Sequence, residues 1–204
     1  MRKILIITTI GGFLQQFEMN DIGLLMDKGY EIHYASNFNN PIYDFDQKML
    51  KDMGIVLHPT CIHKSPMQLG ENLKALKEIC RIIKTENITA IHCHNPMGGV
   101  LARLAALRCG KKKVHVIYTA HGFHFYKGAS LVNWLFFFPV EYVLAKWTDC
   151  LVTINREDYL RAKNFRTLKG KKIFQIPGVG IQLNKFADVP ECKEAIRDEL
   201  GIPR

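Results

Sequence analysis

Apolar and polar positions along the chain predict an alternation of strands and helices. Residues 3–8 form a continuous apolar run, which is typical of a central parallel strand that is buried on both faces. Further strands are predicted at residues 30–35, 54–58, 88–93, 114–118, 150–154 and 172–176. Helical spacing or composition predicts helices at residues 14–28, 44–53, 66–85, 98–109, 131–147 and 157–165. Repeated strand–helix units predict an α/β fold, a Rossmann-like, doubly wound and mostly parallel sheet with helices on both faces.

Two of the predicted helices carry more information than the others. Pro66 suits the first turn of the helix over residues 66–85. The apolar stripe expected along that helix is Leu69, Leu73, Leu76, Ile79, Cys80 and Ile83. The helix over residues 131–147 is too apolar for an ordinary exposed helix. It is either buried, which we favour slightly, or presents a face that dips into a bilayer with help from Lys127 and Lys146.

Composition limits the class of protein and the kind of partner. The 204 residues carry a net charge of +9, which favours anionic partners such as nucleic acid, acidic lipid or phosphorylated substrates. The six cysteines include no CxxC pair, and we expect them to be reduced and buried in a cytoplasmic protein. No stretch approaches the roughly 18 apolar residues of a membrane-spanning helix.

Candidate chemistry concentrates directly after the strand predicted at residues 114–118. In open α/β sheets, ligands bind at the carboxyl ends of the strands, so this segment predicts a site for an anionic substrate that contains a ring. Its candidate binding residues are Thr119, His121, Gly122, Phe123, His124, Tyr126 and Lys127. His121 could donate a proton or a hydrogen bond or pair with a phosphate, and Lys127 could hold a phosphate. The aromatic residues could face a sugar ring or an acyl chain, or pack on the next helix.

Weaker candidates follow other predicted strands. Gly11, Gly12 and Phe13 form either a tight turn or a loop that lets backbone approach a phosphate. The sequence His92-Cys93-His94-Asn95 suggests zinc, but no further ligand cluster is evident, and we expect His94 and Asn95 to provide one polar contact in a cleft.

Two further loops contain the remaining candidate residues. Asn155 is expected to cap a helix, with a contact in the cleft as the second interpretation. The turn that contains Gly178 and Gly180 could allow an interdomain crossover and the close approach of a ligand.

These motifs together resemble the N-terminal half of family 4 glycosyltransferases, in particular the bacterial capsule and exopolysaccharide branch. The segments that carry the resemblance, in order, are residues 11–13, 91–96, 101–106, 118–128, 148–155 and 176–180. The resemblance implies a GT-B enzyme with two Rossmann-like domains, which retains anomeric configuration, uses a nucleotide sugar and needs no metal or other cofactor. It implies that Gly12 and Phe13 lie near the donor diphosphate and the acceptor, and His121 near the reacting sugar. It places Gly178 and Gly180 near the hinge between the domains.

The resemblance also predicts how the chain is organised. Residues 1–188 would form the acceptor-binding domain, and residues 189–204 a charged helix or linker toward a donor-binding domain that this chain lacks. We therefore expect the chain alone to be inactive. The expected partners are a nucleotide sugar, a polyprenyl-diphosphate-linked or oligosaccharide acceptor, and the inner face of the cell membrane, but not nucleic acid.

Two other functions remain to be weighed against transfer. The chain could be a non-catalytic module, derived from the same fold, that docks on a membrane or a partner. A nucleotide-binding oxidoreductase domain is disfavoured because the chain has no GxGxxG motif and no acidic residue at the end of the second predicted strand.

Overall fold

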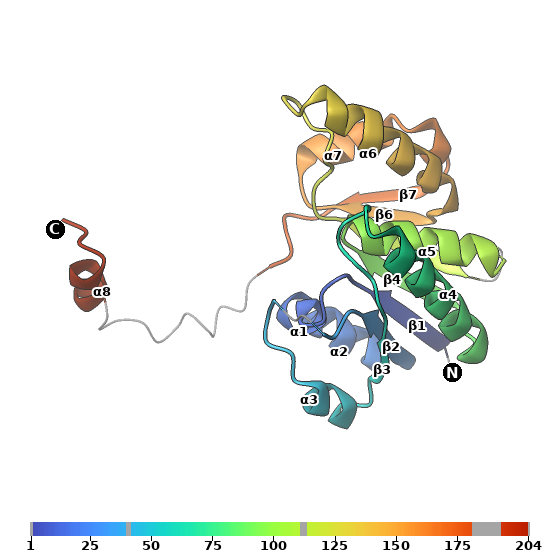
Figure 1. The fold of residues 1–204 in the computed structure, drawn as a ribbon, viewed down its shortest axis with the longest axis horizontal. Coiled ribbons are helices and arrows are strands. Elements are labelled where there is room, and N and C mark those ends of the chain that lie inside the picture. The colour runs from blue at the N-terminus through green and yellow to red at the C-terminus, as the bar shows by residue number, and fades with distance from the viewer. Residues whose placement is uncertain (1, 40–41, 111–113, 181–192, 204) are drawn as a thin grey trace.

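A computed structural model describes residues 2–39, 42–110, 114–180 and 193–203. The described residues up to 180 form one seven-stranded parallel sheet flanked by helices (Figure 1). The strand order is β3-β2-β1-β4-β5-β6-β7, and every neighbouring pair is parallel. The strands are β1 (Arg2–Ile7), β2 (Tyr30–Ser36), β3 (Val56–Pro59), β4 (Ala90–His94), β5 (His115–Ala120), β6 (Cys150–Thr153) and β7 (Lys172–Gln175). All seven predicted strands and the predicted doubly wound α/β fold are confirmed.

The helices connect these strands in the predicted order. They are α1 (Phe13–Phe17), α2 (Met19–Asp27), α3 (Gln47–Asp52), α4 (Leu69–Thr85), α5 (Pro96–Arg108), α6 (Leu131–Leu144), α7 (Arg156–Lys163) and α8 (Lys193–Glu199). Short 3-10 turns, Ala145–Trp147 and Arg166–Leu168, follow α6 and α7. The charged helix or linker predicted over residues 189–204 falls partly on residues 189–192 and 204, which lie outside the described residues.

Alternate residues of β1 bury themselves in two separate apolar clusters. Leu5 and Ile7 belong to the larger cluster, which α4 and α5 cover, while Ile4 and Ile6 belong to a smaller one with residues of α2 and α3. Because side chains alternate across a strand, this division means that β1 is covered on both faces, as its apolar sequence predicts. The strand order reverses direction between β1 and β4, and such a switch point opens a crevice at the carboxyl ends of the two strands.

Three predictions about helices need correction. The helix predicted over residues 14–28 is two helices, because the backbone leaves helical geometry at Glu18. The helix α4 begins at Leu69 rather than Pro66, and Pro66 lies in the turn before it. Its outer face carries Leu69 and Leu73, both exposed, so the predicted apolar stripe is wrong at its first turn. The buried face uses Asn72 instead, whose side chain accepts from the His63 N–H at 3.0 Å and donates to the Ser65 carbonyl.

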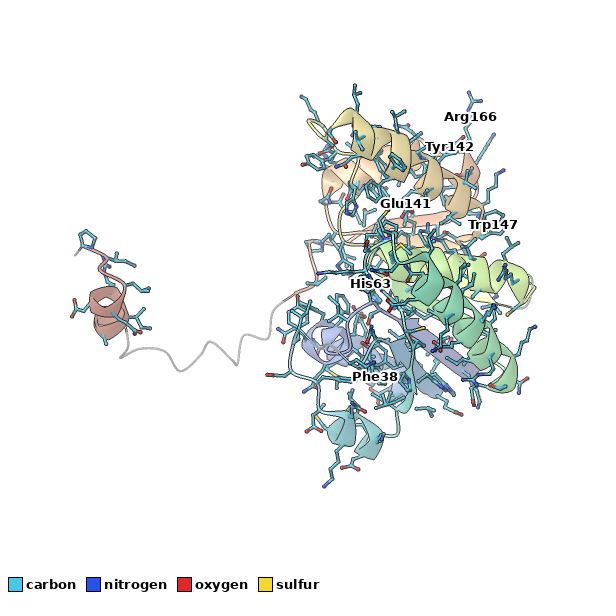
Figure 2. All side chains as sticks on the ribbon, in the orientation of Figure 1. Phe38, His63, Glu141, Tyr142, Trp147 and Arg166 are labelled. Atoms are coloured by element: carbon cyan, nitrogen blue, oxygen red, sulfur yellow. The ribbon has the colours of Figure 1, made fainter. Side chains whose placement is uncertain are left out.

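A buried ion pair joins α6 to α5. Arg103 lies on α5 and is 1% exposed, and its two terminal nitrogens contact the two carboxylate oxygens of Glu141 at 2.7 and 3.1 Å. Glu141 lies on the side of α6 that faces α5 and the sheet (Figure 2). The guanidinium lies 4.2 Å from the centre of the Tyr118 ring, on β5. These contacts fix the position of α6 over the sheet.

Cysteines and membrane-crossing segments give two shorter findings. Of the five described cysteines only Cys93 is fully buried, and the other four are half-buried, so the expectation of uniform burial is wrong; all five are free thiols. Within the described ranges, we find no helix that combines the length and apolar character needed to cross a bilayer.

Candidate functional site

The carboxyl ends of β1, β4 and β5 bring three of the predicted motifs together. These strands are neighbours in the sheet, so the segments that follow them meet at one edge. The ring of Phe13, at the start of α1, lies 5.2 Å from the ring of His94 and 5.3 Å from that of His121. The two histidine rings lie 5.4 Å apart. The structure therefore places the turn of Gly11, Gly12 and Phe13 beside His94, at the end of β4, and His121, directly after β5.

The glycine turn after β1 is fixed by its neighbours on both sides. The Tyr34 hydroxyl, buried on β2, donates to the Gly11 carbonyl at 2.8 Å. A methyl group added at Gly12 would come within 2.5 Å of the Tyr43 carbonyl oxygen. Gly12 is therefore required for close packing of two backbone segments.

Asn95 ties the end of β4 to the end of β1. It has a left-handed backbone (φ 61°), which asparagine tolerates better than most residues, and it precedes Pro96 at the start of α5. Its side-chain oxygen accepts from the backbone N–H and the hydroxyl of Thr9 at 3.2 and 3.3 Å. Asn95 thus holds the two strand ends in register.

A buried polar cluster lies beneath the glycine turn. His94 Nδ1 is 3.2 Å from His121 Nε2 and 3.5 Å from a carboxylate oxygen of Glu18. His92, on the same side of β4 as His94, has its Nε2 2.9 Å from the hydroxyl of Thr119. His94 is 1% exposed and Glu18 4%, whereas His121 is half-buried. Of these side chains His121 is therefore better placed than His94 or Glu18 to meet a substrate.

Burial sets the protonation of this cluster. Burial lowers the pKa of His92 to about 4. It lowers the pKa of His94 well below the ordinary value for histidine, and it also lowers the pKa of His121. Burial, followed by the nearby Asp21, raises the pKa of Glu18 to about 7. Near neutral pH all three imidazoles are consequently neutral, and each has one nitrogen that accepts.

The other predicted residues of the 119–128 segment gather in a second place. A hollow of about 530 Å³ is lined by Gly122, Phe123, His124, Tyr126, Asn133, Asn155, Glu157 and Asp158. Gly122 has a positive φ of 146°, and this turn separates His121 from the residues of the hollow. The backbone N–H of Lys127 donates to a Glu157 carboxylate oxygen at 2.6 Å, while its side chain is exposed. The single predicted site is thus two sites joined by a short segment.

The aromatic residues of this segment have two different environments. Phe123 and Phe125 are buried, and their rings stack on each other at 4.7 Å and against Phe165. The ring of Phe125 packs inward, which is the alternative considered for the aromatic residues, whereas Phe123 packs inward and also lines the hollow. His124 and Tyr126 alternate with them and are exposed.

Asn155, Gly178 and Gly180 are also placed. Asn155 caps α7 by accepting from the Asp158 N–H at 2.8 Å, which confirms the favoured interpretation, and it also lines the hollow. Gly178 and Gly180 follow β7 at the far edge of the sheet, with φ of 100° and 77°. The described contacts do not bring them into either site.

Comparison with known proteins identifies the family. The family model described as Glycosyl transferase 4-like matches residues 8–155. The chain belongs to this family. It is 36% identical over 202 residues to EpsD of Bacillus subtilis (strain 168), a protein assigned as a glycosyltransferase, covering 98% of this chain and 50% of that protein. It is 26% identical over 196 residues to the UDP-Gal:alpha-D-GlcNAc-diphosphoundecaprenol alpha-1,3-galactosyltransferase of Escherichia coli, covering 94% and 47%.

Solved structures agree on the fold of this glycosyl transferase 4-like chain. The sucrose-phosphate synthase of Thermosynechococcus elongatus aligns with a TM-score of 0.59 at 14% identity, covering all of this chain and 53% of that one. The chain spans about half the length of the curated relatives that it matches. The Rossmann-like half of a GT-B fold inferred from the sequence is confirmed.

One residue of the buried polar cluster, Glu18, is not indicated by any motif in the sequence. The helix predicted over residues 14–28 makes Glu18 an ordinary helical position, yet Glu18 lies at the break between α1 and α2 and contacts His94. The sequence offers one indication, because Glu18 follows Phe17 on an otherwise apolar helical face. An acidic side chain that is buried on such a face is rarely without a partner.

The helix α6 of the chain carries an uncovered apolar face. Leu131, Leu135 and Phe136 are 79%, 74% and 69% exposed, and Val132, Val140 and Val143 are exposed beside them. The interpretation of α6 as a buried helix is therefore wrong for the described part of the chain. Asn133, from the first turn of α6, lines the hollow, so the apolar face begins where the polar hollow ends.

Proposed function

We propose that the chain is the acceptor-binding part of a retaining glycosyltransferase, which moves a sugar from a nucleotide sugar to a polyprenyl-diphosphate-linked glycan in surface polysaccharide synthesis. Family membership supports the reaction class, and the position of His121 supports the location of the site. His121 lies beside the glycine turn of β1 at the switch point of the sheet, half-buried and in contact with His94. That is where open α/β sheets bind nucleotides and sugars.

In this proposal His121 acts on the donor sugar. The acceptor hydroxyl attacks the anomeric carbon, the bond to the diphosphate breaks, and the diphosphate leaves with the electron pair. A neutral His121 can donate one hydrogen bond, which orients the sugar or stabilises charge that develops in the transition state. The donor diphosphate would be held mainly by a second domain. The relatives are about twice as long as this chain, which leaves enough residues for such a domain.

The acceptor would lie across the hollow and α6. The hollow offers amides from Asn133 and Asn155, the ring of Tyr126 and the carboxylate of Glu157, which are side chains that recognise sugar hydroxyls and ring faces. The exposed apolar face of α6 would take the polyprenyl tail or the bilayer around it, while Lys127 and the +9 net charge favour the diphosphate and anionic headgroups. The E. coli relative is named for an acceptor of this class. The protein would thus work at the cytoplasmic face of the membrane.

Transfer by the full-length protein tests the role of His121. His121→Ala is expected to lower kcat by about 100-fold or more, as for other groups that stabilise a transition state, while the variant remains folded. His115→Ala is the matched control, because His115 is exposed at the opposite end of the same strand. Unchanged turnover in His121→Ala would remove His121 from the mechanism.

A second experiment tests the lipid acceptor and separates transfer from a pure docking function. Leu135→Glu should abolish flotation with anionic vesicles and raise KM for a polyprenyl-linked acceptor, but leave turnover of a lipid-free acceptor unchanged. The exposed face of α6 also suits a non-catalytic docking module, which is the second candidate. That candidate predicts flotation lost in Leu135→Glu and no sugar transfer with any donor.

A further inference from the structure

Two polar atoms of the buried cluster beneath the glycine turn have no partner. These are Oε2 of Glu18 and Nε2 of His94, both fully buried and without a hydrogen bond. An unpaired buried carboxylate oxygen costs on the order of 1–3 kcal/mol or more, so a native protein rarely keeps such atoms in two residues that contact each other, as Glu18 and His94 do. The position calls for a group that satisfies both.

Donor atoms of three residues converge at this position. Glu18, His92 and His94 each offer one ligand atom, and the three atoms lie within 4.8 Å of one another. The residues come from the α1–α2 break and from alternate positions of β4, so the fold rather than a short motif brings them together. The sequence pattern His-x-His lacked a further ligand, and Glu18 supplies it.

The remaining nitrogens of the two histidines are already engaged. His92 Nε2 contacts the Thr119 hydroxyl at 2.9 Å, and His94 Nδ1 contacts His121 at 3.2 Å. Histidines that bind metals commonly use one nitrogen for the ion and hold the other in a hydrogen bond, which fixes the tautomer. One nitrogen of each histidine is thus held, and Nε2 of His94 has no partner.

We propose that Glu18, His92 and His94 bind one transition-metal ion of the zinc type. Two neutral imidazoles and a carboxylate form a donor set that Zn²⁺ accepts, whereas Mg²⁺ and Ca²⁺ prefer oxygen ligands alone. The ion would compensate the buried Glu18 charge and fix the proton of His94 on Nδ1, where it faces His121. The site departs from the expectation that no metal is bound, and it does not depend on the proposed glycosyl transfer.

Metal binding by the full-length protein tests this directly. After treatment with a chelator and dialysis, the protein is titrated with Zn²⁺, with Co²⁺ as a spectroscopic probe and with Mg²⁺ as a negative probe. We expect one equivalent of Zn²⁺, visible absorption bands from one bound Co²⁺, and no saturable binding of Mg²⁺. Absence of Zn²⁺ and Co²⁺ binding at micromolar protein would overturn the proposal, whatever the protein's transferase activity.

Variants locate the ion. Glu18→Gln keeps the shape of the side chain, His92→Gln keeps roughly its length, and each should weaken Zn²⁺ binding by on the order of 100-fold. His58→Gln is the matched control, because His58 belongs to a second histidine–glutamate group, with His33 and Glu31, whose contacts at 2.9 Å satisfy His33. Binding that survives both Glu18→Gln and His92→Gln, or that is lost equally in His58→Gln, would place the ion elsewhere and refute the site. Circular dichroism of each variant checks that it is folded.

Discussion

Replacement of Arg103 by Met tests the ion pair that holds α6 on the sheet. Arg103→Met removes both contacts to Glu141 and a third hydrogen bond, from Arg103 Nε to the Gly99 carbonyl at 2.8 Å. Glu141 is then left buried with only the hydroxyl of Tyr118, at 3.3 Å. Burial, and then the Glu141 carboxylate, raises the pKa of Tyr118 well above its ordinary value, so this hydroxyl keeps its proton but cannot neutralise the charge.

The magnitude follows from the burial of both partners. Breaking a buried pair on one side costs about 3–5 kcal/mol, because the remaining charge is uncompensated. For a chain of this size, that loss lowers the midpoint of thermal unfolding by roughly 6–20 °C. Arg103→Met/Glu141→Met replaces both charges with apolar side chains of similar length, and is expected to return to within about 1 kcal/mol of the wild type or to exceed it.

Urea unfolding of the two single variants and the double variant measures the coupling. We expect the midpoint to fall strongly in each single variant with an unchanged slope, and to recover in the double variant. Lys3→Met is the control, since Lys3 and Glu31 lie 3.0 Å apart but are partly exposed, and it should cost at most about 1 kcal/mol. A loss below about 1 kcal/mol in Arg103→Met, or a double variant as unstable as the sum of the singles, would refute this account of the pair.

Three further substitutions test packing, the loop and pH dependence. Gly12→Ala should destabilise the chain by about 1–3 kcal/mol in urea, because the added methyl meets backbone at 2.5 Å, whereas Gly23→Ala, in open space on α2, should stabilise it slightly. Asp158→Ala leaves the buried N–H of Phe123 without its acceptor at 3.0 Å, and should cost about 1–3 kcal/mol and speed hydrogen exchange of the loop. Burial lowers the pKa of His58, so its neutral form stabilises the fold above the unfolded pKa of about 6.5 and that contribution is lost as the pH falls. His58→Gln should therefore show a shallower loss of stability between about pH 7 and pH 5, measured by urea unfolding at each pH.

The positions of the strands along the chain were predictable because a strand that is buried on both faces consists of a continuous run of apolar residues. A run such as residues 3–8 leaves few alternatives to a central strand, and the helices between such runs force parallel pairing. The exposure of Leu69 and Leu135 was not predictable in the same way. Periodicity reports that a helix has an apolar face, but it does not report whether this chain, a lipid or another protein covers that face.

The candidate site was half predictable for a related reason. His121 and Gly12 follow strands, and the edge of the sheet to which they belong is set by topology alone. Glu18 follows no strand, and only the return of the chain after α1 brings it to His94. The inward packing of Phe123 and Phe125 follows a pattern of two residues. In an extended segment alternate side chains point to the same side, so Phe123 and Phe125 are buried and His124 between them is exposed.

That extended period explains how one short segment serves two places at once. The backbone from His121 to Tyr126 turns alternate side chains inward and outward, so the stacked rings of Phe123 and Phe125 anchor it in the core. The anchored segment holds His121 against the β4 histidine at one end and His124 and Tyr126 at the hollow on the other. Because the Phe125 ring also contacts Trp134 and Phe138 of α6, the hollow, the apolar face and His121 share one rigid support. In the proposed reaction, a donor sugar at His121 and an acceptor on the hollow and α6 would thus meet surfaces whose spacing is set by the core rather than by a flexible loop.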